Sequence, residues 1–128
     1  MNLNDERLSK LPFLDYLKEM HSRIKGIRHT NKSNSAYSEA RELSHHIINR
    51  YIKEYNLTWE NYNSQPAGQH LRLSAQKLEL YNHKASDKRK GEVIAEFVRE
   101  FEYDLMNMIR ARERNKENPS TPIEDEPI

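Results

Sequence analysis

The sequence predicts an all-α protein, a bundle of about four main helices, and three observations support this prediction. Only 3 Gly and 5 Pro occur in 128 residues, so few turns are available to connect short elements. The chain is 32% charged with a mean hydropathy of −1.07, which is typical of helices that keep one face in water. Apolar residues recur at spacings of three and four, the period of a helix face.

Length and composition indicate one helical domain, residues 1–114, followed by an acidic tail, residues 115–128, that prolines interrupt and that we expect to be disordered. No apolar run approaches the roughly 20 residues of a membrane span. The early Asp5 and Glu6 do not resemble a secretory signal. Cysteine is absent, which excludes disulfides, thiolate zinc sites and a cysteine nucleophile. We therefore expect a cytoplasmic protein with no cofactor and no metal.

The first segment is predicted to be a short turn and then a helix. Asn4 is a candidate cap for the turn through Leu8 and Leu11, and Pro12 suits the first turn of the helix that follows. Gly26 weakens that helix near its end. The stripe of this helix consists of Phe13, Leu17, Met20, Ile24 and Ile27, with Leu14 beside it.

The second segment is a long amphipathic helix that Ser33, Asn34 or Ser35 can cap. Its broad apolar face carries Tyr37, Ala40, Leu43, Ser44, Ile47, Ile48, Tyr51, Ile52 and Tyr55. The chain then turns after Asn56, where Thr58 can cap a short turn. We expect Trp59 in this turn to fill part of the core.

Two more helices complete the predicted bundle. Residues 68–81 form the third, with Leu71, Ala75 and Leu78 on one side and Leu73 and Leu80 nearly opposite, a pattern typical of a helix that is central or at an interface. Ser86 can cap the last helix, which extends to about Arg114. Its stripe consists of Ile94, Phe97, Val98, Phe101, Leu105, Met108 and Ile109.

Pairs of Arg and His give the clearest catalytic candidate. Four residues separate Arg41 from His46, and five separate Arg23 from His29. These spacings resemble the R-x4-6-H signature of HEPN-type ribonucleases, small helical bundles that commonly dimerise to build a joint site. In such a site Arg stabilises the phosphate and His transfers the proton of the attacking 2′-hydroxyl. Here Glu42 replaces the polar residue that usually follows the Arg.

Other catalytic patterns are missing or incomplete in the sequence. Glu42 and His45 supply the Glu-x-x-His pattern of a carboxylate-bridged metal site once, whereas such a site in a bundle needs two copies. The sequence contains no Gly-rich phosphate loop, no nucleophile elbow and no HExxH. We therefore place binding above catalysis and do not expect an enzyme.

Uneven charge supports nucleic-acid binding as an alternative function. Residues 1–90 carry 16 Lys and Arg against 10 Asp and Glu, a net charge of +6, whereas residues 91–109 carry one Arg against five acids, a net charge of −4. Phosphate contacts need only positive charge. The candidate contacts are Arg28, Lys32, Arg50, Lys53, Lys84, Lys88, Arg89 and Lys90. The segment LRLSAQKLELY, residues 71–81, also resembles the turn and recognition helix of MerR-type regulators, with Arg72 where a glycine is usual.

Protein recognition is the leading hypothesis, because the last helix carries a second line of residues opposite its apolar stripe. Arg99, Tyr103, Met106 and Arg110 follow one another at spacings of four, three and four, and Glu92 and Glu96 continue that line. Arg, Tyr and Met are enriched at interface centres. We expect a regulatory or inhibitory module that occupies a surface of a macromolecular partner, a protein before a nucleic acid, and that forms a homo-oligomer. The composition is similar to that of phage or mobile-element accessory proteins.

Overall fold

The computed structural model describes residues 6–27, 33–64 and 66–114, and these residues are almost entirely helical, with no strand among them. The elements in chain order are α1 (Glu6–Lys10), α2 (Phe13–Gly26), α3 (Ser33–Glu54), α4 (Trp59–Ser64), α5 (Pro66–Gln76), the 3₁₀ helix η2 (Lys77–Leu80) and α6 (Asp87–Arg114). The predicted all-α class is confirmed. The predicted acidic tail lies outside the described residues, as do Asn4, Arg28, His29 and Lys32.

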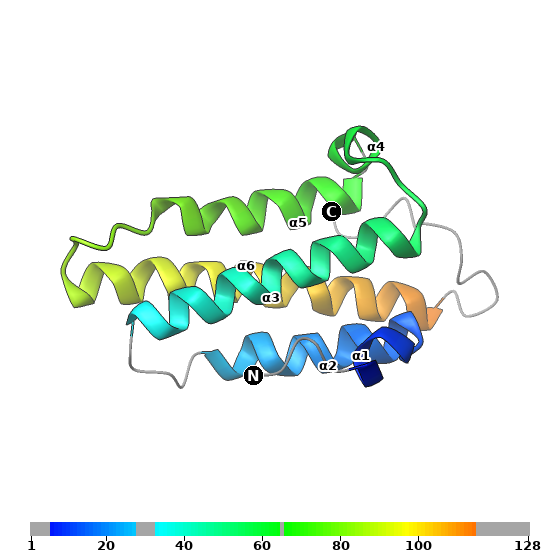
Figure 1. Ribbon diagram of the computed structural model, residues 1–128, viewed down its shortest axis with the longest axis horizontal. Helices are drawn as coiled ribbons and strands as arrows, with labels where there is room; N and C mark the ends of the chain where they lie inside the picture. The colour runs from blue at the N-terminus through cyan, green and yellow to red at the C-terminus, as the bar shows by residue number, and fades with distance from the viewer. Residues whose placement is uncertain (1–5, 28–32, 65, 115–128) are drawn as a thin grey trace.

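The four long helices form an antiparallel bundle (Figure 1). Helices α2, α3, α5 and α6 run alternately in opposite directions along the long axis, and the short helices α1 and α4 lie near one end. Helix α6 contacts each of the other three long helices. It is therefore the element around which the others are arranged.

The core combines the apolar stripes of all four long helices with a group of aromatic rings. The predicted α6 stripe is buried throughout its length, from Ile94 to Ile109. Tyr16, Tyr51 and Tyr62 are also among the large side chains that water does not reach. Burying rings of this size contributes a large share of the free energy that stabilises such a bundle.

Hydrogen bonds from side chains cap the N-terminal ends of α4 and α6, as predicted. The Asn61 N–H donates to Thr58 Oγ1 over 3.0 Å, and the Arg89 N–H donates to Ser86 Oγ over 3.2 Å. The hydroxyl groups of Thr58 and Ser86 thus accept hydrogen bonds from backbone N–H groups that have no partner within the first turn of a helix. Between α3 and α4, Asn56 adopts a positive φ of 53°, a conformation that Asn tolerates better than most residues.

One expectation about a buried residue is wrong. Trp59 does not fill the core but is 59% exposed, because it begins α4 on the surface, while Tyr62 of the same helix is buried instead. The third helix was predicted to be central or at an interface, and the second of these alternatives stays a prediction. The helix is not central, because α5 lies at the outside of the bundle (Figure 1), and η2 replaces its last turn from Lys77. Leu73 and Leu80 on its outer side are consequently exposed.

None of the helices in the described part of the chain combines the length and the apolar character needed to cross a lipid bilayer.

Candidate functional site

An outward surface made by α5, η2 and α6 carries three of the four large hydrophobic side chains that are exposed among the described residues. Leu73 is 48% exposed, Leu80 59% and Tyr103 60%. Leu73, Lys77 and Leu80 follow one another at spacings of four and three, so they share one side of α5 and η2. We call this surface, with the outer residues of α6, the α5–α6 face.

Two polar contacts fix α5 and η2 against α6. Lys77 Nζ lies 3.1 Å from Glu96 Oε1, which brings the line of Leu73 and Leu80 beside α6. One turn away, the Ser74 hydroxyl donates a hydrogen bond to Asp104 Oδ2 in the buried seam between the helices. The two helices that form the α5–α6 face are thus held together by one buried contact and one contact near the surface.

The six residues predicted for partner binding all lie on α6, away from its buried stripe. Glu92, Arg99, Tyr103 and Arg110 are exposed, whereas Glu96 and Met106 are half-buried. Glu92 makes an ion pair with Arg89, and the Arg99 guanidinium lies 3.7 Å from the Glu100 carboxylate. Such exposed pairs contribute little to stability, so these side chains remain available for contacts.

The described basic residues that were predicted for nucleic-acid binding do not form one continuous group, and Arg28 and Lys32 lie outside the described residues. Lys84, Lys88 and Arg89 are exposed where η2 leads into α6, whereas Lys53 is exposed near the other end of α3, at the opposite end of the bundle (Figure 1). Lys90 is buried, with its Nζ 6.0 Å from the centre of the Tyr81 ring. Lys90 is therefore much less accessible to a phosphate than the exposed Lys88 and Arg89 beside it, and its role as a contact stays a prediction.

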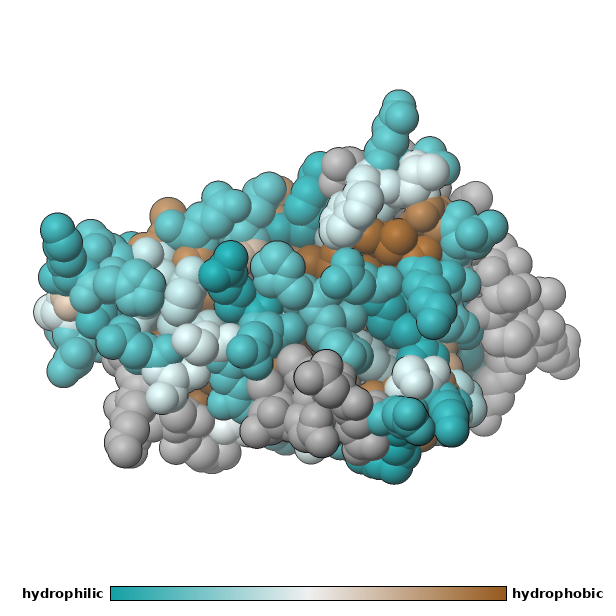
Figure 2. All heavy atoms as spheres, in the orientation of Figure 1, coloured by the Kyte–Doolittle hydropathy of each residue, from teal (hydrophilic) through white to brown (hydrophobic). Residues whose placement is uncertain are grey.

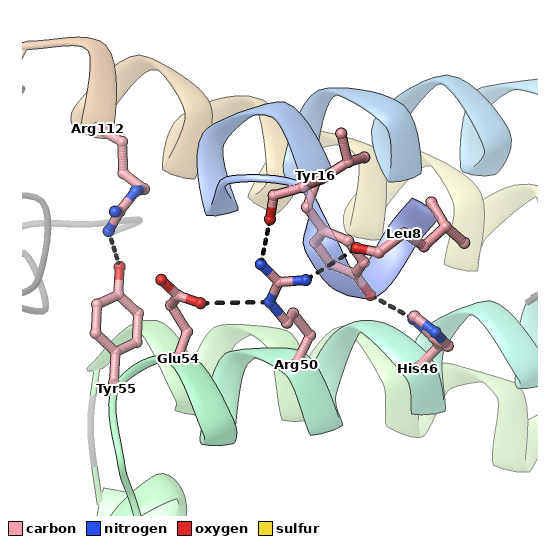
Figure 3. Close-up of polar contacts among 8 residues, drawn as sticks. Leu8, Tyr16, His46, Arg50, Glu54, Tyr55 and Arg112 are labelled. Carbon is pink, nitrogen blue, oxygen red and sulfur yellow. Dashed lines mark hydrogen bonds and ion pairs between the residues drawn. The ribbon is translucent and has the colours of Figure 1, made fainter. Parts of the chain in front are cut away.

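Arg50, a predicted phosphate contact that stays untested, has partners within the protein (Figure 3). Its guanidinium donates hydrogen bonds to the carbonyl oxygens of Leu8 (3.1 Å) and Leu11 (2.6 Å) and to Glu54 Oε2 (3.3 Å). It also lies 4.7 Å from the centre of the Tyr16 ring. The carbonyl groups at the end of α1 lack intrahelical partners, and Arg50 satisfies two oxygens in that region.

Tyr16 extends the same cluster to His46 on α3 (Figure 3). Its hydroxyl lies 2.5 Å from His46 Nδ1, and the two rings stack with centroids 5.6 Å apart. Burial raises the pKa of the Tyr16 phenol, while the positive charges of Arg50 and Arg23 partly oppose that rise. The phenol therefore stays protonated at neutral pH.

Arg41 and His46 lie on different sides of α3. Residues five apart on a helix differ by about 140° in direction. Arg41 accordingly points to solvent, whereas His46 packs against Tyr16 of α2. The partner residue of the second candidate pair, His29, lies outside the described residues.

Arg112 is a second cation that the structure places in the interior. Its Nη1 donates to Tyr55 Oη over 2.6 Å, and its guanidinium lies 4.9 Å from the centre of the Phe13 ring (Figure 3). This contact ties the end of α6 to the end of α3 and to α2.

A groove of about 510 Å³ opens between α3 and α5, beside α4. Five residues of α3 at helical spacings form one wall: Tyr37, Arg41, Ser44, His45 and Ile48. Trp59 and Tyr62 of α4 contribute to it, and Arg72 of α5 lies on the opposite wall. Figure 2 shows hydrophobic surface exposed between α3 and α5 in this region.

Metal binding has no support in the described residues. Among residues 6–27, 33–64 and 66–114, no three His, Asp or Glu side chains are grouped so that they could hold a metal ion. Glu42 and His45 are both exposed. The single Glu-x-x-His pattern is therefore not extended into a cluster by the fold.

Sequence reasoning identified the α6 part of the α5–α6 face but not the groove. The signal for the α5 part was present, since Leu73 and Leu80 lie opposite the apolar side of their helix. No comparable signal marked the groove, because it depends on how α4 and α5 pack against α3.

Comparisons with protein-family models, with curated proteins and with solved structures found no match to this chain.

Proposed function

We propose that this protein is a small regulatory or inhibitory module that binds a protein partner through the α5–α6 face. The observation that carries the proposal is that Leu73, Leu80 and Tyr103 are exposed on α5, η2 and α6, which the Ser74–Asp104 and Lys77–Glu96 contacts hold side by side. Three exposed large hydrophobic residues on elements that also carry the Lys77–Glu96 ion pair combine apolar and charged groups, as protein interfaces do. Arg99 and Arg110 add a residue type that is enriched at the energetic centres of interfaces.

A protein partner fits better than a nucleic acid because of how charge is distributed. The outer side of α6 carries both signs, with Glu92 and Glu96 in its first half and Arg110 in its second. A phosphate backbone would favour a continuous basic surface. Of the predicted phosphate contacts, Arg50 instead donates hydrogen bonds to backbone carbonyl groups, and Lys90 is buried.

A second copy of the chain is one candidate partner, and the charge order on α6 supports it. Glu96 and Arg110 each lie seven residues from Tyr103. In an antiparallel pair centred on Tyr103, Glu96 of each copy would face Arg110 of the other, as an isologous interface requires. Sedimentation of the protein identifies such a pair. Glu96→Arg and Arg110→Glu should each dissociate it, and the double variant should restore it.

The proposal is tested by measuring how single substitutions change affinity for the protein that the chain captures from an extract of its source cells, with nuclease present. Tyr103→Ala and Leu80→Ala should each weaken binding about tenfold or more, because truncating a central anchor costs roughly 2 kcal/mol. Trp59→Ala is the matched control, since Trp59 is as exposed as Leu80 but lies on α4.

A different result would contradict the proposal. If nuclease abolishes capture, if affinity falls steeply with salt, and if replacing Lys88 and Arg89 by Glu removes binding while Tyr103→Ala does not, the ligand is a nucleic acid. Under the proposal, the charge reversal at these two positions should change mainly the association rate.

A further inference from the structure

Two residues that line the groove between α3 and α5 each carry a buried polar atom that has no hydrogen-bond partner among the described residues. These atoms are Tyr62 Oη and Arg72 Nε. Tyr62 is only 2% exposed, so water does not readily compensate its hydroxyl. A buried donor without a partner costs free energy, roughly 1–3 kcal/mol. Two such groups in one groove indicate a place where a bound molecule would supply the missing partners.

Positive charge exceeds negative charge around the groove. Arg41 and Arg72 line it, and the ion pairs found among the described residues involve neither of them. Glu79 is the acidic residue in the lining, and His45 is a further basic group. The Arg72 charge also acts on Tyr62: it lowers the pKa of the phenol, against the larger rise that burial causes. The groove therefore favours a negatively charged occupant.

The rest of the lining is apolar or aromatic. Trp59, at 59% exposure, presents its ring at one end, and Tyr37 lies at the other end of the α3 wall. Ile48 and Leu78 also contribute to the lining. A volume of about 510 Å³ falls within the range of roughly 300–1,000 Å³ that small-molecule sites occupy.

We propose that this groove binds a small organic anion that combines an aromatic ring with a carboxylate or phosphate group. The ring would pack against Trp59 and Ile48, and the acidic group would accept hydrogen bonds from Arg41, Arg72 and the Tyr62 hydroxyl. This site is separate from the α5–α6 face and does not depend on the function proposed for that face.

The test uses three probes that share a naphthalene ring: 2-naphthoate, 2-naphthyl phosphate and the neutral 2-naphthamide. Trp59 is the only Trp of the chain, so its indole N–H signal in a nitrogen-15 NMR spectrum reports binding directly. Both anions should shift this signal, and at least one should bind about tenfold or more tightly than the amide, because charge-assisted hydrogen bonds are the stronger ones. The tighter anion identifies which acidic group the groove prefers.

Substitutions assign the effect to the groove. Arg41→Met and Arg72→Met should each weaken binding of the preferred anion by roughly fivefold to tenfold. Arg114→Met, an exposed Arg at the end of α6, is the matched control and should leave the affinity for the anion unchanged. Since Arg72 is half-buried and its variant could fold poorly, the exposed Arg41 alone suffices for this comparison.

Tyr62→Phe gives a readout that a purely structural role would not produce. It should weaken anion binding while leaving the melting temperature of the free protein unchanged or higher, because the removed hydroxyl has no partner there. The proposal is overturned if no probe shifts the Trp59 signal at millimolar concentration. It is also overturned if the amide binds as tightly as the anions, or if Arg41→Met leaves the affinity unchanged.

Discussion

Arg50 Nη2 donates a hydrogen bond of 2.6 Å to the carbonyl oxygen of Leu11, in the turn between α1 and α2. This bond joins segments 39 residues apart in the sequence, and the same guanidinium also binds the Leu8 carbonyl. A flat, forked cation is well suited to this position, because it reaches two oxygens while its face rests on the Tyr16 ring.

Replacing Arg50 by Lys should lower the free energy of unfolding by about 2 kcal/mol, because a single ammonium cannot replace the forked set of hydrogen bonds. Urea denaturation measures the change. Lys53→Met on the same helix is the control and should stay within about 0.5 kcal/mol, since Lys53 is exposed. Equal effects of the two substitutions would show that the Arg50 contacts contribute nothing.

Arg41 and His46 should behave differently on substitution, because they lie on different sides of α3. His46→Ala should cost about 1–2 kcal/mol by removing the partner of the buried Tyr16 hydroxyl. Arg41→Ala should leave stability within about 0.5 kcal/mol. Thermal denaturation of both variants, together with an assay of RNA cleavage by the parent, tests this. Cleavage that both substitutions abolish in folded protein would favour a HEPN-like ribonuclease.

Trp59 and Tyr62 of α4 should also differ in their effects on stability. Trp59→Ala should change the free energy of unfolding by less than about 1 kcal/mol, because most of this side chain faces solvent. Tyr62→Ala should cost about 3 kcal/mol or more, since it empties a buried site. Chemical denaturation of the two variants provides the comparison. A larger loss for Trp59→Ala would mean that Trp59 is the residue that fills the core.

Periodicity predicted the helices and most of the core correctly, because the spacing of apolar residues states directly which side of a helix is buried. The stripe of α6 from Ile94 to Ile109 is an example. The helix caps were predicted equally well, because Thr58 and Ser86 accept hydrogen bonds from backbone N–H groups only three residues later. These features depend on neighbours within four residues.

Features that depend on distant residues were not predictable in the same way. Nothing near Arg50 in the sequence shows that it binds carbonyl groups 39 and 42 residues earlier. Trp59 is large and apolar, so residue type favoured the core, but α4 turns it outward while Tyr62 faces inward. Asp104 shares the apolar side of α6 with Phe101 and Met108, but its hydrogen-bond partner Ser74 comes from α5, 30 residues earlier, and nothing near Asp104 in the sequence shows this contact.

Asp104 should make the protein less stable as pH rises, which is the reverse of the usual behaviour of a carboxylate. Burial raises its pKa above the ordinary value. The Ser74 hydrogen bond and the charge of His70 oppose this rise, whereas the nearby Glu100 adds to it. The folded state then binds a proton more tightly than the unfolded state. Stability must consequently fall between the ordinary Asp pKa, about 4, and the raised pKa of the folded state.

Asp104→Asn removes this titration but keeps an oxygen that accepts the Ser74 hydrogen bond. The variant should match the parent near pH 3, where Asp104 is protonated in both states, and should be more stable than the parent at pH 7. Urea denaturation from pH 3 to pH 8 measures the difference, with the exposed Asp15→Asn as control. If the parent were instead the more stable protein at pH 7, ionised Asp104 would stabilise the seam between α5 and α6. Its burial would then not be the dominant influence on its charge.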